Sequence, residues 1–281
     1  MSLHGHLDLL AGADESGRPV LRRQSFAAPI HISKPHHDAG WLVVNLASPG
    51  PGLLAGDRVD VRVEVERGAK LLLTAPSASR IHMMPSGHAE LTQSFHIANG
   101  AALDVWPEYL IPQAGARYRQ RTRIEVAPGG SLLWTESIAP GRTAHGEVFA
   151  FTELRIATDI FHGAAHLVRE RYRLSPPDAA TSALRRTFPA AYYASIVCIS
   201  DAVRDDSACW PAIRALHDSG RVWLGTSRLA PGAFAVKLTA ADSPTLRTTV
   251  AAIRSAFQLA TGVEPPSVRR VTAKNSVPVG F

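Results

Sequence analysis

The chain has 281 residues, of which 46% are hydrophobic and 19% are charged, and its net charge is +6. This composition excludes a disordered protein and supplies enough apolar side chains for a large core. No apolar run reaches the roughly 18 residues of a membrane span, and the N-terminus lacks the basic and apolar regions of a signal peptide. We therefore expect a cytoplasmic protein without membrane contacts.

Several classes of site are excluded by motifs that the sequence lacks. The only cysteines, Cys198 and Cys209, do not form a CxxC pair, so we expect buried thiols rather than a disulfide framework or a zinc site. The sequence has no G-x-S-x-G nucleophile elbow, no phosphate-binding loop and no HExxH motif. We therefore expect that the protein is not an enzyme.

A strand-turn-strand pattern recurs along the first part of the chain. Residues 59–65 read VDVRVEV, and this strict alternation predicts a half-buried strand. The glycines Gly68, Gly100, Gly129 and Gly163 follow four such segments and lie 32, 29 and 34 residues apart. A quasi-period of about 30 residues favours a stacked, coiled body of two sheets. An ordinary β-sandwich whose hairpins resemble one another is the alternative.

The composition changes after residue 175. We predict a repeated all-β body over 1–175, a mixed strand and helix part over 176–262 packed on it as one domain, and a loose tail over 263–281. Within the second part the pattern predicts helices over 179–186 and 210–216 and a strand over 192–200. The clearest helix begins with Ser243 as N-cap and Pro244 at the first helical position, and it ends at Gly262.

In three of the repeated units a carboxylate lies an even number of positions from the apolar residues of its strand; it thus shares their parity. Because alternate side chains of a strand point to opposite faces, Asp57, Glu136 and Glu170 are predicted to point inward. Glu108 falls at a similar place in its unit. A buried carboxylate needs a partner or a purpose, because an isolated buried charge is costly. The set predicts a polar interior path, and the alternative is that a core arginine neutralises each acid.

Arginine and histidine form two further patterns. Arginines at 117, 119, 121 and 123 share one strand face, which indicates a solvated face or a docking site for an acidic protein; RNA binding is the weaker alternative. His162 and His166 have the spacing of a helical metal pair but span a predicted turn, so a tight histidine site is not expected. Weak, transient contact with nickel remains open because nickel accepts imidazole and carboxylate ligands.

The order and spacing of several motifs resemble the UreD (UreH) family of urease accessory proteins over about residues 20–175. These motifs are SPGPGLLAGDR (48–58), GAKLLLT (68–74), WPE (106–108), SLLWTE (131–136) and PGR (140–142). The resemblance implies a mainly β, β-helix-like body of two stacked sheets with a few C-terminal helices. It further implies a non-enzymatic chaperone that links apo-urease to the UreF protein and the UreG GTPase.

The resemblance also implies that nickel reaches urease through an internal passage. Residues that match its polar positions are Asp57, Ser79, Glu136 and Glu170. Oxygen ligands suit a passage because they hold nickel weakly, so no tightly bound cofactor is expected. Partner contacts are expected at Glu108, Arg117, Arg119, Arg121, Arg142 and Phe257, with urease, UreF and UreG as partners and no nucleic acid. The alternatives are a docking-only scaffold, or a divergent relative with another client and no metal passage.

Overall fold

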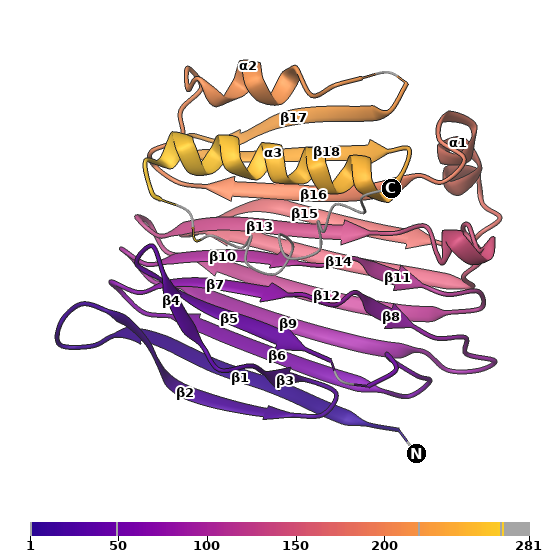
Figure 1. Ribbon diagram of the computed structural model, residues 1–281, viewed down its shortest axis with the longest axis horizontal. Coiled ribbons are helices and arrows are strands. Elements are labelled where there is room, and N and C mark those ends of the chain that lie inside the picture. The colour runs from indigo at the N-terminus through magenta and orange to yellow at the C-terminus, as the bar shows by residue number, and fades with distance from the viewer. Residues whose placement is uncertain (1, 49, 219, 265, 267–281) are drawn as a thin grey trace, which may run out of the picture.

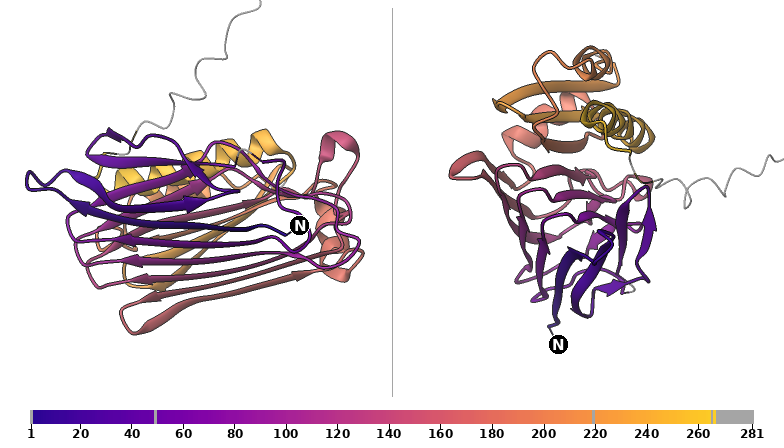
Figure 2. Two further views of the ribbon diagram at one scale, coloured as in Figure 1. Left: turned by 90° about the horizontal axis from the view of Figure 1, so that it is seen from below. Right: turned by 90° about the vertical axis from the view of Figure 1, so that its left-hand side faces the viewer.

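The computed structural model describes all residues except 1, 49, 219, 265 and 267–281. Most of the predicted tail, 263–281, therefore lies outside the described residues. The rest folds into a seven-stranded sheet and an eleven-stranded sheet that face each other, with helices beside them (Figures 1 and 2). The predicted fold class, a mainly β body of two stacked sheets with C-terminal helices, is confirmed.

The seven-stranded sheet has the order β15-β14-β12-β9-β6-β1-β2. Its strands are β1 (His4–Ala13), β2 (Pro19–Ala27), β6 (Arg58–Val65), β9 (Ala89–Ile97), β12 (Arg117–Val126), β14 (Glu153–His162) and β15 (Ala165–Leu174). All pairs from β1 through β6, β9 and β12 to β14 are parallel, whereas the two edge strands β2 and β15 pair antiparallel with their neighbours.

The eleven-stranded sheet has a main path of order β17-β18-β16-β13-β10-β7-β5-β3, with three short strands beside it. The path consists of β3 (His31–Ile32), β5 (Trp41–Ala47), β7 (Lys70–Ala75), β10 (Ala102–Pro107), β13 (Ser131–Ile138), β16 (Tyr192–Ile199), β17 (Val222–Ala230) and β18 (Ala233–Ala240). The short strands are β4 (His36–Asp38), β8 (Ser79–Ile81) and β11 (Leu110–Pro112).

The predicted repeat is a coil that alternates between the two sheets. Strands β6, β9 and β12 lie in one sheet, and each is followed by its partner, β7, β10 or β13, in the other. Equivalent strands of successive coils pair in parallel, which a sandwich of hairpins would not do. The turns stack as well, since the Gly68 amide donates to the Gly100 carbonyl and the Gly100 amide donates to the Gly129 carbonyl, both at 3.0 Å.

The prediction of a fourth, looser copy is wrong in its topology. Strands β14 and β15 form an antiparallel hairpin within the seven-stranded sheet, so the chain does not cross to the other sheet at Gly163. The reason is the two-residue turn of Gly163 and Ala164, which is too short to span the space between two packed sheets. The hairpin ends the coil, and β16 then adds to the other sheet antiparallel to β13.

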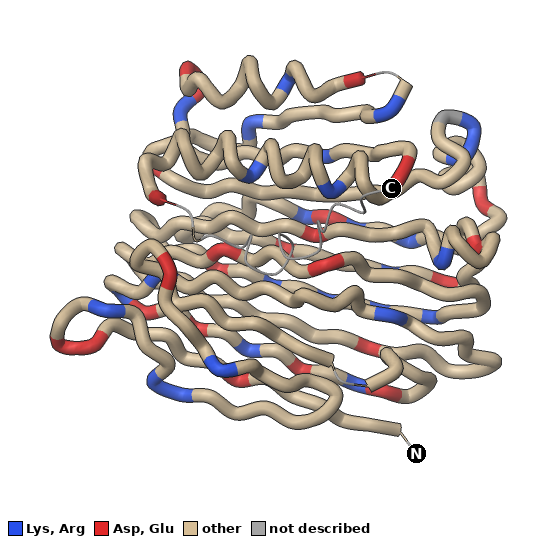
Figure 3. Tube along the Cα trace, in the orientation of Figure 1, with Lys and Arg blue, Asp and Glu red and all other residues tan. Residues whose placement is uncertain are grey.

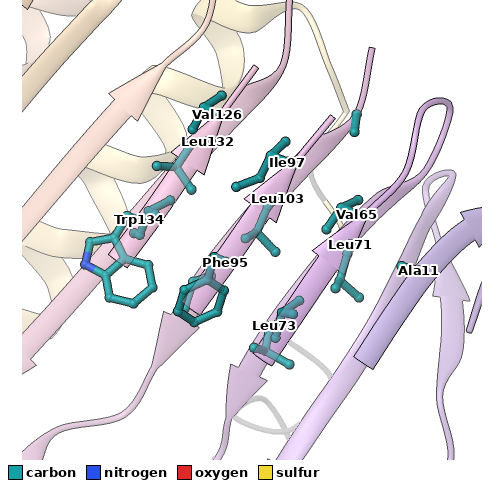
Figure 4. Packing of buried hydrophobic residues seen from close by; sticks show 14 of the residues in the cluster. Ala11, Val65, Leu71, Leu73, Phe95, Ile97, Leu103, Val126, Leu132 and Trp134 are labelled. Carbon is teal, nitrogen blue, oxygen red and sulfur yellow. The ribbon is translucent and has the colours of Figure 1, made fainter. Parts of the chain in front are cut away.

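The main core lies between the sheets and is built from equivalent positions of successive coils. Leu71, Leu103 and Leu132 share one register row, and Leu73 and Trp134 belong to the next row along the strands (Figure 4). Phe95 of the opposite sheet meets Trp134 edge to face, with 5.2 Å between ring centroids. A polar side chain on this inner face is therefore placed among stacked apolar rows.

The C-terminal part contains the helices α1 (Ala179–Thr187), α2 (Cys209–Arg214) and α3 (Ser243–Thr261), and a short 3-10 helix spans Thr143–His145. Helix α3 covers the outer face of β16 and β18 through a second apolar cluster (Figure 2). Its N-cap is Asp242, not the predicted Ser243, because the Asp242 carboxylate accepts the amide of Thr245. No helix of the described part is long and apolar enough to cross a membrane.

Replacing Gly129 by alanine should destabilise the coil. Gly129 has φ +77°, and an added Cβ would lie 2.5 Å from Nδ2 of Asn99, whose amide holds the Pro128 carbonyl. We expect a loss of about 1–2 kcal/mol in the free energy of unfolding, measured by urea denaturation. Gly225→Ala is the matched control because its added Cβ meets nothing within 4 Å and its φ is not positive. Equal effects of the two variants would contradict this reasoning.

Candidate functional site

A cavity of about 260 Å³ lies between the two sheets. Apolar side chains, among them Leu73, Phe95 and Trp134, form much of its wall, but polar side chains reach it from both sheets. The polar lining includes Ser79, Gln93, Glu108, Gln120 and Glu136. Since Ser79 is exposed and Glu136 is buried, the cavity connects the surface at β8 with the interior at β13.

Glu136 is the buried acid at the inner part of this cavity. It lies on the same face of β13 as Leu132 and Trp134, and only 8% of it is exposed. The Gln120 amide donates to its Oε1 at 2.5 Å, and no described cationic side chain forms an ion pair with it. Burial raises the pKa of Glu136 to about 7, and the negative charge of Glu170 acts in the same direction against the Gln120 hydrogen bond.

Glu170 is the second buried acid, and it is fully partnered. It faces inward from β15 between exposed arginines, as its parity predicts. Its carboxylate accepts from the Tyr193 hydroxyl at 3.2 Å and from the Ser195 hydroxyl at 3.3 Å. Lys237 on β18 donates to the same Oε1 that Tyr193 contacts. The two acids thus differ, because Glu170 forms an ion pair with Lys237, whereas Glu136 forms none with the residues that the structure describes.

The two acids belong to one polar layer that crosses the molecule between the sheets. In the eleven-stranded sheet Glu136 is opposite Ser195, and Ser195 is opposite Lys237, across three neighbouring strands. In the seven-stranded sheet the corresponding row across four neighbouring strands consists of Gln93, Thr122, Thr158 and Glu170. The coil repeat supplies Gln93, Thr122 and Glu136 of this layer, whereas Glu170, Ser195 and Lys237 lie on strands that follow the coil.

Two hydroxyl groups of this layer differ in their hydrogen bonding. The Thr122 hydroxyl accepts from the Gln93 amide at 3.0 Å. Thr158 of the neighbouring strand is 2% exposed, and its hydroxyl has no hydrogen-bond partner in the described part of the chain. An unpaired buried polar atom is unfavourable, and this one lies on the strand between those of Glu170 and Thr122.

The other two residues predicted for the passage lie nearer the surface. Ser79 lines the cavity on β8 and is exposed. Asp57 lies in the turn before β6, where its carboxylate accepts the amides of Leu3 and Leu54 at 2.9 and 2.8 Å. Asp57 is buried, but the cavity wall is formed by its neighbours Leu53 and Val59 and not by Asp57 itself.

No described set of residues forms a preorganised metal site. Groups of three or more His, Cys, Asp or Glu that could hold a metal are absent from the described part of the chain. His166 instead contacts Asp159 at 2.9 Å, and the hairpin between β14 and β15 rules out helical spacing with His162. Both cysteines are buried and free, as predicted, and burial raises the pKa of Cys198 to about 12. The polar layer therefore offers oxygen atoms from only two acids, amides and hydroxyls.

Comparison with known proteins identifies the family of the chain. The family model described as UreD urease accessory protein matches residues 3–273. The chain belongs to the UreD family. A urease accessory protein UreD of Opitutus terrae is 38% identical over 259 residues, which are 91% of this chain and 94% of that relative. UreD proteins of Kocuria rhizophila and Deinococcus radiodurans are 33% and 31% identical over 65% and 64% of this chain, and the matches cover 48% and 66% of those relatives.

Membership of the UreD family confirms the predicted resemblance and assigns the chain a role in urease maturation.

The residues predicted for partner contacts occupy different environments in this UreD-family fold. Arg117, Arg119 and Arg121 lie on the outer face of β12, where charges of both signs interleave (Figure 3). Arg119 lies 3.9 Å from Glu153, and Arg121 lies 3.3 Å from Glu90. This face remains our predicted contact surface for a protein partner.

The other three predicted partner residues are engaged within the chain. Glu108 lies on the cavity wall and forms an ion pair with Arg247 of α3 at 3.0 Å. Arg142 forms a two-pronged ion pair with Glu147 and holds the pKa of that carboxyl below its usual range. Phe257 has no exposed surface and packs edge to face on Trp210, so it is a core residue that a partner cannot reach in this fold.

The alternative that a core arginine neutralises each of the three inward acids is not what the described residues show. Glu136 has an amide partner, Glu170 has a lysine, and Asp57 has backbone amides. The buried arginine that does neutralise an acid is Arg254, and its partner is Asp104.

Sequence analysis missed Gln120, Ser195 and Lys237. The parity argument would have found Gln120, because it alternates with Tyr118 and Thr122 on the inner face of β12. Lys237 carried a weaker signal, a single charge within the apolar run AFAVKLTA of β18. Its contact with Glu170 joins residues 67 positions apart, which no local pattern shows.

Proposed function

We propose that this chain is a non-enzymatic, cytoplasmic scaffold of urease maturation that links apo-urease to UreF and UreG and passes nickel through its interior polar layer. The observation that carries the nickel proposal is Glu136, a buried carboxylate with no cationic partner among the described residues, which faces a cavity that reaches the surface. A carboxylate buried without a counter-ion is costly, and a passing cation would offset that cost.

The chemistry of the layer suits transit rather than storage. Carboxylate, amide and hydroxyl oxygens bind nickel less tightly than a closed set of imidazoles or thiolates, so the ion can leave again. Because the pKa of Glu136 is about 7, the acid changes charge at little free-energy cost near neutral pH. An arriving cation would displace the proton, and the proton would return when the cation leaves.

A docking-only scaffold is the second candidate, and the Lys237 contact favours it. Glu170 already has a full set of partners, as expected for a structural ion pair. In that case loss of Glu170 would lower the melting temperature, because Lys237 would lose its partner, and nickel transfer would not depend on the layer. Normal melting combined with poor urease activation would support transit instead.

The scaffold proposal is tested by co-expressing the tagged chain with apo-urease subunits, UreF and UreG and recovering its complexes. We expect urease subunits and UreF to be recovered together, and urease activity to depend on the chain at limiting nickel. Folded chain that recovers none of these proteins would contradict the scaffold proposal and favour a divergent relative with another client. Recovery of the complex without any nickel-dependent effect would favour the docking-only scaffold.

A further inference from the structure

Lys237 lies where the polar layer reaches the solvent. It projects from β18 of one sheet to Glu170 on β15, the edge strand of the other sheet. The Lys237 side chain is 51% exposed, whereas the Glu170 side chain is 6% exposed. The ammonium group also lies 5.7 Å from the centroid of the Tyr172 ring. The lysine therefore bridges the two sheets at the outer limit of the layer.

A metal cation bound to Oε1 of Glu170 would have to replace the Lys237 ammonium, which donates to that oxygen. The same carboxylate is held by the hydroxyls of Tyr193 and Ser195, which could remain in place around another cation. The buried hydroxyl of Thr158, opposite Glu170 in the neighbouring strand, has no hydrogen-bond partner among the described residues. The Glu170 carboxylate is thus accompanied by two hydroxyl oxygens besides the ammonium group.

Lysine is suited to give way to another cation. Its ammonium is a compact point charge on a flexible stem, and here half of the side chain is already in solvent. When it swings outward, the ammonium regains its hydration while Glu170 stays buried with its hydroxyl partners. A bidentate arginine would be harder to displace, because its planar group makes two parallel hydrogen bonds to one carboxylate.

We propose that Lys237 is an internal counter-ion that competes with divalent cations for Glu170, so that it limits how long nickel is held and closes this edge of the polar layer. Nickel as the cation rests on the proposed function, whereas the competition itself concerns binding by the purified chain. The lysine is a positioning residue here, since it acts on the metal through Glu170.

The competition predicts that removing the charge of Lys237 strengthens nickel binding. In Lys237→Met, which keeps much of the stem, we expect the dissociation constant for Ni²⁺ to fall by roughly tenfold or more, because a like charge close to the cation is removed. Lys237→Arg keeps the charge and should not bind more tightly than the unaltered chain. Lys70→Met, on the outward side of β7, is the matched control and should have no effect. Equilibrium dialysis of the full chain against NiCl₂ measures all four proteins.

Two further results would overturn the inference. Unchanged affinity in folded Lys237→Met would show that the lysine does not compete. Equal tightening in Lys237→Met combined with Glu170→Gln would show that the cation is not held by Glu170. The double variant also removes both charges together, so it is expected to fold even if the single variant is unstable.

A measurement on the unaltered chain avoids the stability question. Displaced Lys237 should react faster with an acetylating reagent, so saturating Ni²⁺ should raise acetylation of Lys237 relative to Lys70 by mass spectrometry. No change in this ratio would overturn the proposal. These measurements do not involve urease activation, so they test the competition separately from the nickel passage. A Glu136 variant that activates urease normally would contradict the passage and leave the competition intact.

Discussion

Replacing Glu136 by glutamine is expected to lower urease activation by roughly tenfold or more at limiting nickel, the scale of losing a residue that helps to hold a metal. The variant keeps the shape of the side chain and can still accept the Gln120 hydrogen bond, but it cannot become negative. Binding of urease and UreF should be unchanged, because Glu136 is buried. Activity of co-expressed urease across a nickel titration measures the effect.

Glu125→Gln is the matched control for this substitution. Glu125 is also on a central strand of the body, but its side chain is 36% exposed on the outer face and pairs with His96 and Arg123. Its loss removes the same charge from the chain without touching the polar layer, so activation should remain normal. Equal activation by Glu136→Gln and the unaltered chain at limiting nickel would remove Glu136 from any passage.

The same substitution should also change how stability depends on pH. The pKa of Glu136 is about 7 in the folded chain, above its ordinary value of 4.5, so the folded state binds the extra proton between these two pH values. Stability from this group is therefore complete below about 4.5 and is lost as the pH rises through about 7. We expect the unaltered chain to lose about 2–3 kcal/mol relative to Glu136→Gln between pH 5 and pH 8. Urea denaturation of both proteins at the two pH values tests this, and a constant difference would contradict the assigned pKa.

The coil of the body was predictable because its information is local. Alternating valines mark strands, and glycines at a regular interval mark turns that need positive φ, as found at Gly68, Gly100 and Gly129. The fourth unit was not predictable in the same way. Its strands read like the earlier ones, and the difference between a hairpin and a coil lies in how few residues separate β14 from β15.

The candidate site was predictable only for residues whose own strand reveals their orientation. Parity placed Glu136 and Glu170 on the inner face, and both are buried there. The contact between Glu170 and Lys237 depends on β18, whose pairing with β16 follows from a C-terminal topology that the repeat does not specify. Asp57 shows where the parity argument fails. It has the inward parity but lies in a turn, where parity no longer determines the direction of a side chain.

Replacing Arg254 by methionine is expected to cause the largest loss of stability. Arg254 lies on α3 and forms an ion pair with Asp104 of β10, and both side chains are almost completely buried. Thr135 accepts from the guanidinium at 2.6 Å, and the Trp106 ring lies 4.4 Å away. Methionine would leave the Asp104 charge buried with only the Gln258 amide beside it. We expect the free energy of unfolding to fall by about 3–5 kcal/mol, measured by urea denaturation.

Two further variants distinguish the effect of the unpaired buried charge on stability from the effect of losing a contact of α3. Combining Arg254→Met with Asp104→Asn removes both charges, so most of the lost stability should return if the unpaired carboxylate is the cause. Arg247→Met breaks an ion pair of the same helix whose arginine is 53% exposed, and it should cost no more than about 1 kcal/mol. If the double variant is as unstable as Arg254→Met, the guanidinium contributes through packing against Trp106 and Thr135 rather than through charge. In either case the contact between Arg254 and Asp104 joins residues 150 positions apart. This contact holds α3 on the coil in addition to the packing of the apolar face of the helix.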